Sequence, residues 1–298
     1  MKIQDQKAEQ AMTILAPAKL NLSLRLGPKG PSGLHQIFSY MQTISLCDEI
    51  NIRVLPSQPG KQMARIQLTC SDPRLPTDQD NLLYQALDLW LGKTGLKPHL
   101  RVHLDKNIPS QAGLGGGSSD AAAGLLALQE LFPQARLEAG DLQDLAFSLG
   151  SDVPFFLTQG LAQVSGYGDQ VTPLPDLAKS YFILAKPKLD ISTRQAFQSW
   201  DEAHPQQSDL RTEQKMWAVT APYINDFQDL QASRYPIIRE LIDFLETSPA
   251  RQVALSGSGP SVFASYGHIL EQKTCYKRLK EKFPCCQVWA VESLARPR

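Results

Sequence analysis

The chain has 298 residues, enough for two domains of ordinary size, each with its own hydrophobic core. Hydrophobic residues make up 42% of it and charged residues 20%, the balance of a globular protein in water. Thirty basic and thirty acidic residues cancel, so the net charge predicts neither a nucleic-acid partner nor an anionic membrane surface. An anionic small molecule would need a local basic site.

Neither the N-terminus nor the cysteines indicate export. Residues 1–10 are polar, so we expect no signal peptide or anchor, and no apolar run approaches the roughly 18 residues of a membrane helix. The five cysteines form no C-x-x-C pair and no zinc spacing, which favours reduced thiols and a cytoplasmic protein. The adjacent Cys285 and Cys286 leave a redox pair or a metal site open.

The first hundred residues predict antiparallel strands and one helix. Alternating or β-branched hydrophobic residues indicate strands over 17–26, 37–44, 50–54 and 64–70, and apolar residues at helical spacing indicate a helix over 81–91. In the first strand, four leucines alternate with polar and charged residues, a pattern that an exposed sheet face also produces. A further strand over 100–105 follows.

A glycine-rich loop comes next and opens directly into a helix. Glycines at 113, 115, 116 and 117 remove every Cβ, so backbone N–H groups can turn toward an anion, and a helix is predicted over 118–132. Ser118 and Ser119 are favourable N-cap residues whose hydroxyls can reach phosphate or a metal ion. This arrangement indicates a phosphate site, with a flexible turn as the alternative; the Walker Gly-Lys-Ser/Thr ending and the Rossmann fingerprint are absent.

The remaining elements alternate between helices and short strands. A second glycine loop, Ser256 to Ser261, could equally be a plain hairpin turn. We place a domain boundary near residues 174–180, where Pro and Asp interrupt the pattern. The predicted elements are helices over 142–149, 218–228, 235–245 and 271–283 and strands over 181–187, 251–255, 262–264 and 288–291.

The motif Pro-x-x-x-Gly-Leu-Gly-Gly-Gly-Ser-Ser-x-Ala-Ala from residue 109 closely resembles the ATP loop of the GHMP kinases, named for galactokinase, homoserine kinase, mevalonate kinase and phosphomevalonate kinase. The other matching motifs occur in the order of one family among them, the 4-diphosphocytidyl-2-C-methyl-D-erythritol kinases. They are Pro17-Ala-Lys-Leu-Asn-Leu, Gly33-Leu-His35, Gly150-Ser-Asp-Val-Pro-Phe, Asn225-Asp226 and Leu255 to Phe263.

This resemblance implies an α+β fold of two domains. Residues 1–175 would form a ribosomal-protein-S5-domain-2-like ATP-binding domain, and residues 176–298 a ferredoxin-like domain. It also implies ATP and Mg²⁺ as cofactors and transfer of phosphate to the 2-hydroxyl of a cytidyl-diphosphate substrate in the non-mevalonate route to isoprenoids. A monomer or weak homodimer is expected, with neither nucleic acid nor membrane as a partner.

The resemblance further assigns roles to individual residues. Asp152 would take or orient the hydroxyl proton, and Lys19 would keep that carboxylate ionised and offset charge on the transferred group. The residues implied for ATP are Asn81, Leu82, Lys106, Pro109, Ser110, Gln111, Ala112, Gly113, Leu114, Gly115, Gly116, Gly117, Ser118 and Ser119, with the first three at the adenine and Ser119 also toward Mg²⁺. Those implied for the substrate are Asn21, His35, Phe197, Ser256, Gly257, Ser258 and Gly259, with His35 on the cytosine edge and Phe197 stacked on its ring.

The chain departs from the family pattern at three places, of which only Leu34 encourages a different substrate. Leu34 stands where the family often has a tyrosine, so it can pack on a base but not stack, and Asp120 stands where asparagine is common. No role can be assigned to Arg194 or to the tail from Arg296 to Arg298. The alternatives are a related kinase for homoserine or a mevalonate-like alcohol, or a catalytically silent ATP-binding protein.

Overall fold

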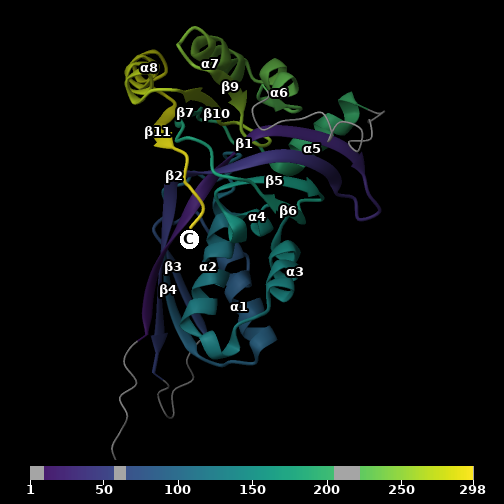
Figure 1. The fold of residues 1–298 in the computed structure, drawn as a ribbon, viewed down its shortest axis with the longest axis vertical. Coiled ribbons are helices and arrows are strands. Elements are labelled where there is room, and N and C mark those ends of the chain that lie inside the picture. Colours follow the sequence, from purple (N-terminus) through teal and green to yellow (C-terminus); the bar gives the residue numbers. More distant parts are fainter. Residues whose placement is uncertain (1–9, 57–64, 205–221, 298) are drawn as a thin grey trace, which may run out of the picture. The chain divides into compact units, whose positions relative to one another are not determined.

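The computed structural model describes residues 10–56, 65–204 and 222–297 (Figure 1). The chain divides into two compact units, which are described separately. Unit 1 comprises Met1–Ala16, Cys47–Asn107 and Gly117–Leu157, and unit 2 comprises Pro17–Leu46, Ile108–Gly116 and Thr158–Arg298. These units do not test the boundary expected near residue 175, which stays a prediction. The expected loose start before residue 10, most of the polar segment 201–214 and Arg298 lie outside the described residues.

Two long strands contribute residues to both units, namely β1 (Ala11–Lys29) and β2 (His35–Leu55). In unit 1 the last part of β2 pairs antiparallel with β4 (His99–Asp105), and β3 (Ile66–Cys70) pairs parallel with β4. The helices that follow these strands are α1 (Leu82–Thr94), α2 (Gly116–Leu131), α3 (Ala139–Leu149) and α4 (Val153–Thr158), with a short 3₁₀ turn at Pro133–Ala135.

Helix α2 is the central helix of unit 1. Its side chains are buried around almost its whole circumference, which explains why the sequence there is alanine- and leucine-rich rather than amphipathic. A Cβ added at Gly124 would lie 2.5 Å from Cδ1 of Leu83, so glycine permits the close approach of α1. Trp90 of α1 is fully buried and donates a hydrogen bond from Nε1 to Oε1 of Gln129, at 3.1 Å.

Unit 2 contains a four-stranded antiparallel sheet in the order β11-β7-β10-β9. Its strands are β7 (Tyr181–Lys186), β9 (Gln252–Leu255), β10 (Val262–Tyr266) and β11 (Gln287–Glu292), and its main helices are α7 (Pro236–Glu246) and α8 (Ile269–Lys282). The chain places helices between β7 and β9 and between β10 and β11, which with this order is the ferredoxin-like topology. The prediction of a ferredoxin-like second half is therefore confirmed.

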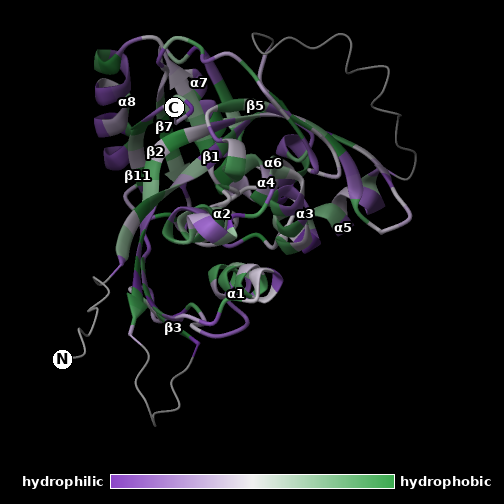
Figure 2. Cartoon of the chain, turned by 60° about the horizontal axis from the view of Figure 1, so that its bottom comes forward, coloured by the Kyte–Doolittle hydropathy of each residue, from purple (hydrophilic) through white to green (hydrophobic). Residues whose placement is uncertain are grey.

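The two helices pack against this sheet through apolar stripes. Helix α7 contacts β9 and β10, while α8 contacts β7, β10 and β11 (Figure 1). The buried residues of α7 are Ile238, Leu241, Ile242 and Leu245, at the spacing of one helix face. Helix α8 is largely hydrophilic along its length, as Figure 2 shows, and buries few side chains.

The remaining elements of unit 2 are shorter. Strand β5 (Leu161–Gly166) pairs antiparallel with the first part of β2 and with β6 (Gln170–Pro173), and β8 (Ile224–Asn225) pairs parallel with β1. The helices are α5 (Thr193–Ala203) and α6 (Gln228–Arg234). Arg296 donates hydrogen bonds to the carbonyls of Leu161 and Leu174, a structural role that the sequence did not reveal.

The helix predicted over 218–228 is wrong in its described part. Residues 224 and 225 form β8, and a helix begins only at Gln228. The reason is tertiary: Nδ2 of Asn225 donates to the carbonyls of Leu255 and Gly257, at 2.7 and 2.8 Å, and these bonds hold the chain extended against helical propensity. Residues 218–221 lie outside the part of the chain that the structure describes.

Candidate active site

Residues 109–115, which we call the phosphate loop after their predicted role, are tightly bent and lead straight into α2. Gly113 and Gly115 have φ angles of 74° and 71°, a region that residues with a Cβ rarely adopt. Helix α2 begins at Gly116, so Ser118 and Ser119 lie in its first turn and the prediction that they cap it is wrong. The positive φ of Gly115 ends the loop, and the helix starts immediately after it. Unpaired N–H groups and the helix dipole at this end favour an anion.

The two glycine loops touch each other within unit 2. Oγ of Ser256 donates to the carbonyl of Gly113 at 3.0 Å, and a Cβ added at Gly113 would lie 2.1 Å from the carbonyl oxygen of Ser256. Gly257 is also confined, though less severely, because its Cβ would lie 3.0 Å from the carbonyl oxygen of Gly113 and 3.4 Å from Nζ of Lys19. The second loop is therefore more than a hairpin turn, since it adjoins both the phosphate loop and a buried cation.

Lys19 is held between these loops. Its backbone N–H donates to the carbonyl of Leu114 at 3.0 Å, and its ammonium group, on a residue only 3% exposed, donates to Oδ1 of Asn21. Nδ2 of Asn21 donates in turn to Oγ of Ser39, at 2.9 Å. The polar side of this strand is therefore buried in a hydrogen-bond network, which rules out an exposed sheet face at these residues.

The other predicted substrate residues of the second loop are also buried. Ser256 is fully buried and Ser258 nearly so, and Oγ of Ser258 lies 3.2 Å from Oγ1 of Thr193. Gly257 and Gly259 both have positive φ angles, 55° and 85°. The side-chain amide of Asn225, in β8, donates a hydrogen bond to the carbonyl of Gly257 and so anchors this loop.

Asp152 precedes α4 directly and is partly buried. It belongs to unit 1, whereas Lys19 belongs to unit 2. The pairing of these two side chains therefore stays a prediction. The position is nevertheless a suitable one for a carboxylate, because it lies at the N-terminal end of a helix.

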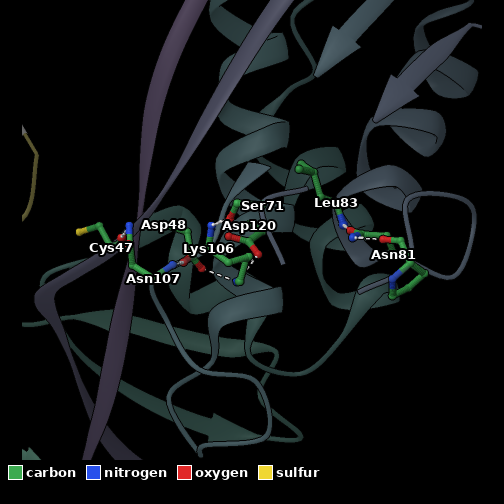
Figure 3. Close-up of polar contacts among 9 residues, drawn as sticks. Cys47, Asp48, Ser71, Asn81, Leu83, Lys106, Asn107 and Asp120 are labelled. Carbon is green, nitrogen blue, oxygen red and sulfur yellow. Dashed lines mark hydrogen bonds and ion pairs between the residues drawn. The ribbon is translucent and has the colours of Figure 1, made fainter. Parts of the chain in front are cut away.

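In unit 1, a buried ionic cluster lies where the chain enters and leaves the phosphate loop (Figure 3). Nζ of Lys106 pairs with Oδ2 of Asp48 and, at 2.7 Å, with Oδ2 of Asp120 near the N-terminal end of α2. Asp48 also accepts from the backbone N–H of Asn107 at 2.6 Å, and Ser71 accepts from the backbone of Lys106 at 2.8 Å. We call Asp48, Lys106 and Asp120 the carboxylate–lysine cluster.

Burial and charge act differently on the members of this cluster. Desolvation raises the pKa of Asp120 from 3.8 to about 7, and the negative charge of Asp48 adds to this effect while Lys106 opposes it. Desolvation alone would lower the pKa of Lys106, but the two carboxylates more than reverse it, so its pKa is raised. Oδ1 of Asp120 is buried and has no hydrogen-bond partner. The cluster thus holds two carboxylates around one cation.

The cluster bears directly on three expectations from the sequence. The ammonium of Lys106, a residue expected beside the adenine, pairs with two carboxylates. The positive charge of Lys106 therefore balances the negative charge of Asp120 without a metal ion. Asn81 caps α1, because its Oδ1 accepts from the backbone of Leu83 at 2.9 Å and its Nδ2 donates to the carbonyl of Pro76. The adenine roles of Asn81, Leu82 and Lys106 stay predictions.

The loop residues differ in exposure. Ala112, Leu114 and Ser119 are buried, Pro109, Gly113, Gly115, Gly116 and Ser118 are half-buried, and Ser110, Gln111 and Gly117 are exposed. In the described ranges, no group of three or more His, Cys, Asp or Glu residues could hold a metal ion. A Mg²⁺ bound at Ser119 would therefore depend on the nucleotide for most of its ligands, as is usual for this ion.

His35 and Phe197 lie against each other in unit 2, and their contacts with a cytosine stay predictions. Their rings stack with centroids 5.0 Å apart and planes 25° apart, and Nδ1 of His35 lies 2.9 Å from the carbonyl oxygen of Gly27. Leu34 is 44% exposed beside them. Asp201 was not identified from the sequence, although its Oδ1 lies 3.0 Å from Nε2 of His35. Asp201 follows Phe197 by four residues, so the two lie on one face of α5, and prediction of this helix would have indicated their proximity.

No helix among the described residues is both long and apolar enough to cross a bilayer. The cysteines at 47, 70, 275, 285 and 286 are all free thiols. Burial raises the pKa of the Cys286 thiol to about 11, with Cys285 adding to the effect, which disfavours the reactive thiolate.

Comparison with known proteins agrees with this geometry. Residues 81–160 match the model of the GHMP kinases N terminal domain. A 4-diphosphocytidyl-2-C-methyl-D-erythritol kinase of Clostridium botulinum (strain Eklund 17B / Type B) is 32% identical over 91% of this chain and 97% of its own length. The kinase of the same name from Protochlamydia amoebophila (strain UWE25) is 36% identical over 85% of this chain and 84% of its own length.

Solved structures extend the likeness to the whole fold. A crystal structure of a 4-(cytidine 5'-diphospho)-2C-methyl-D-erythritol kinase superposes with a TM-score of 0.76 and 30% identity, covering 95% of this chain and 99% of that one. Homoserine kinase from Cytophaga hutchinsonii superposes with a TM-score of 0.72 over 99% and 98% of the two chains, and at 20% identity it shows the fold alone. The α+β GHMP kinase fold is thereby confirmed. The chain belongs to the 4-diphosphocytidyl-2-C-methyl-D-erythritol kinase family of the GHMP kinases.

Proposed function

We propose that this protein transfers the γ-phosphoryl group of ATP to the 2-hydroxyl of 4-diphosphocytidyl-2-C-methyl-D-erythritol, in the non-mevalonate route to isoprenoid precursors. The observation that carries the proposal is the buried ammonium of Lys19, held against the second glycine loop while its backbone binds the phosphate loop. Phosphoryl transfer needs mainly positioning and a local cation, and this arrangement supplies both. The family membership supports the choice of substrate.

In this mechanism the phosphate loop and the first turn of α2 bind the triphosphate through backbone N–H groups. Lys19 offsets the charge that develops on the transferred group, and Asp152 accepts or orients the proton of the substrate hydroxyl. Asn21 orients the Lys19 ammonium by accepting a hydrogen bond from it at Oδ1. Mg²⁺ bound to the nucleotide, with Ser119 nearby, would neutralise the phosphates.

The substrate would be recognised at its base by His35 and Phe197, and along its diphosphate and sugar by Asn21 and the loop from Ser256 to Gly259. Aromatic stacking gives affinity, while the polar contacts select the base. We further propose a cytoplasmic enzyme that acts on small molecules alone, as a monomer or a weak homodimer.

A coupled ADP-release assay with purified protein and Mg-ATP tests the proposal. Diphosphocytidyl methylerythritol is offered beside homoserine, mevalonate and a control without acceptor. We expect ADP release above the control only with the cytidyl compound. Release only with another alcohol would keep the kinase chemistry but overturn the substrate, and no acceptor-dependent release at all would overturn the kinase activity.

A further inference from the structure

Asp201 on α5 is oriented by two neighbours. Its Oδ2 forms an ion pair with Nζ of Lys29, and its Oδ1 lies 3.0 Å from Nε2 of His35. Because Lys29 holds one carboxylate oxygen, the other is directed at the imidazole. Asp201 therefore shares the environment of the residue expected to read the base.

The imidazole of His35 is held in place but not fully satisfied. Its residue is 6% exposed, and Nδ1 uses its proton on the carbonyl of Gly27, at 2.9 Å. Nε2 is buried and makes no well-aligned hydrogen bond, although it lies within ion-pair distance of Asp201. A buried polar atom without a hydrogen bond is uncommon in folded proteins and indicates a missing partner. The ring of Phe197 stacks on the imidazole and helps to hold it in place.

We propose that Asp201 is a specificity-determining residue, whose carboxylate accepts a hydrogen bond from the exocyclic amino group of a cytosine that meets Nε2 of His35. The inference rests on the proposed function, because it takes the base of the substrate to lie at His35 and Phe197. Asp201 would be an additional residue of that site, and its carboxylate would disfavour uracil.

The chemistry of the two pyrimidines decides the selectivity. An ionised carboxylate can only accept hydrogen bonds, and cytosine presents its N4 amino group as a donor where uracil presents the acceptor O4. A uracil in the same position would therefore place two acceptors against each other. Because Nδ1 of His35 uses its proton on the carbonyl of Gly27, Nε2 presents a lone pair at the same edge and can also accept from the amino group of cytosine. Stacking on Phe197 would hold either base equally, so it cannot discriminate between them.

Binding of CDP and UDP to the full-length protein, measured by isothermal titration calorimetry, tests the inference. We expect the wild-type protein to prefer CDP, and Asp201→Asn to reduce the ratio of the two affinities by about 10- to 100-fold, since the carboxamide can donate to O4. Glu202→Gln changes the exposed neighbour on the same helix and is the matched control, which should leave the ratio unchanged. Asp201→Glu keeps an acceptor and should retain the preference for CDP.

The outcomes separate this inference from the proposed function. ATP affinity and circular dichroism confirm the fold of each variant, and Asp201→Ser is measured alongside so that one misfolded variant does not decide the result. An unchanged ratio in folded Asp201→Asn or Asp201→Ser, with normal phosphorylation of the cytidyl compound by the wild type, would overturn the role of Asp201 alone. Failure of the wild type to phosphorylate that compound would instead overturn the proposed function.

Discussion

The carboxylate–lysine cluster leads to a sharp prediction about stability and pH, tested by Asp120→Asn. Asparagine removes the negative charge but keeps an oxygen that can accept from Lys106. The wild-type cluster carries two carboxylates and one ammonium in a buried place, so one negative charge is left over when both acids are ionised. Substitution leaves a balanced pair of Asp48 and Lys106.

The pKa of Asp120 determines the sign of the effect. This pKa is raised from 3.8 to about 7, chiefly by burial and then by Asp48, while Lys106 opposes the shift. The charges of Lys106 and Asp120 also act on the nearby thiol of Cys70. The folded protein therefore holds the Asp120 proton more tightly than the unfolded chain does. The stabilisation is complete below pH 3.8 and is lost as the pH rises to about 7. The wild type should thus lose stability relative to Asp120→Asn across this window.

The magnitude follows from the same values. A tenfold change in proton affinity corresponds to about 1.4 kcal/mol, so the rise of the pKa from 3.8 to about 7 amounts to about 4 kcal/mol. Screening of these charges in the folded protein reduces this figure, and we expect the free energies of unfolding of the two proteins to shift relative to each other by about 2 to 4 kcal/mol.

Urea unfolding of both proteins at pH 4, 5, 6, 7 and 8, followed by tryptophan fluorescence, measures the difference. Trp90 is a suitable reporter because it is fully buried in the same unit. Asp141→Asn is the control, since Asp141 pairs with Lys93 at an exposed site and should show little pH-dependent change. A difference between wild type and Asp120→Asn that stays constant with pH, or grows in the opposite direction, would refute the reasoning.

Three further predictions concern the proposed catalytic residues, the loops and the core. Lys19→Ala and Asp152→Asn should each lower kcat by at least about 10³-fold while ATP still binds, which single-turnover and binding measurements distinguish; near-normal turnover would remove the assigned role. Gly113→Ala should abolish measurable ATP binding, because the new methyl group would lie 2.1 Å from the carbonyl oxygen of Ser256, and calorimetry showing unaltered affinity would contradict that contact. Leu241→Ala should lower the free energy of unfolding by about 2 to 5 kcal/mol, as urea denaturation would show, because its side chain is fully buried against the sheet of unit 2; a loss below about 1 kcal/mol would argue against that packing.

Local signals were sufficient to predict much of the fold. Hydrophobic alternation predicted β1 and β4, a continuous apolar run predicted β7, and the helical spacing of apolar residues predicted α7. Glycine content and the following helix located the phosphate loop. These features depend on residues close together in sequence, so their pattern is visible without the structure.

Other features depend on partners that are remote in sequence and were missed. The extended conformation of Asn225 is set by carbonyls 30 and 32 residues away, and the pairing of Asp48 with Lys106 joins residues 58 apart. Asp201 contacts a histidine from the other half of the chain. The burial of the polar side of the first strand was equally invisible, because an exposed sheet face and a buried hydrogen-bond network show the same alternation.

The contact between the two glycine loops has a consequence for the newly made chain. The carbonyl of Gly113 is held by a serine 143 residues further along, so this part of the phosphate loop cannot reach its final form until nearly the whole polypeptide has left the ribosome. A nascent or prematurely terminated chain that ends before Ser256 would contain the entire motif from Pro109 to Ser119 and still lack its supporting partner. Support of this loop by its serine is therefore coupled to completion of the second half of the chain.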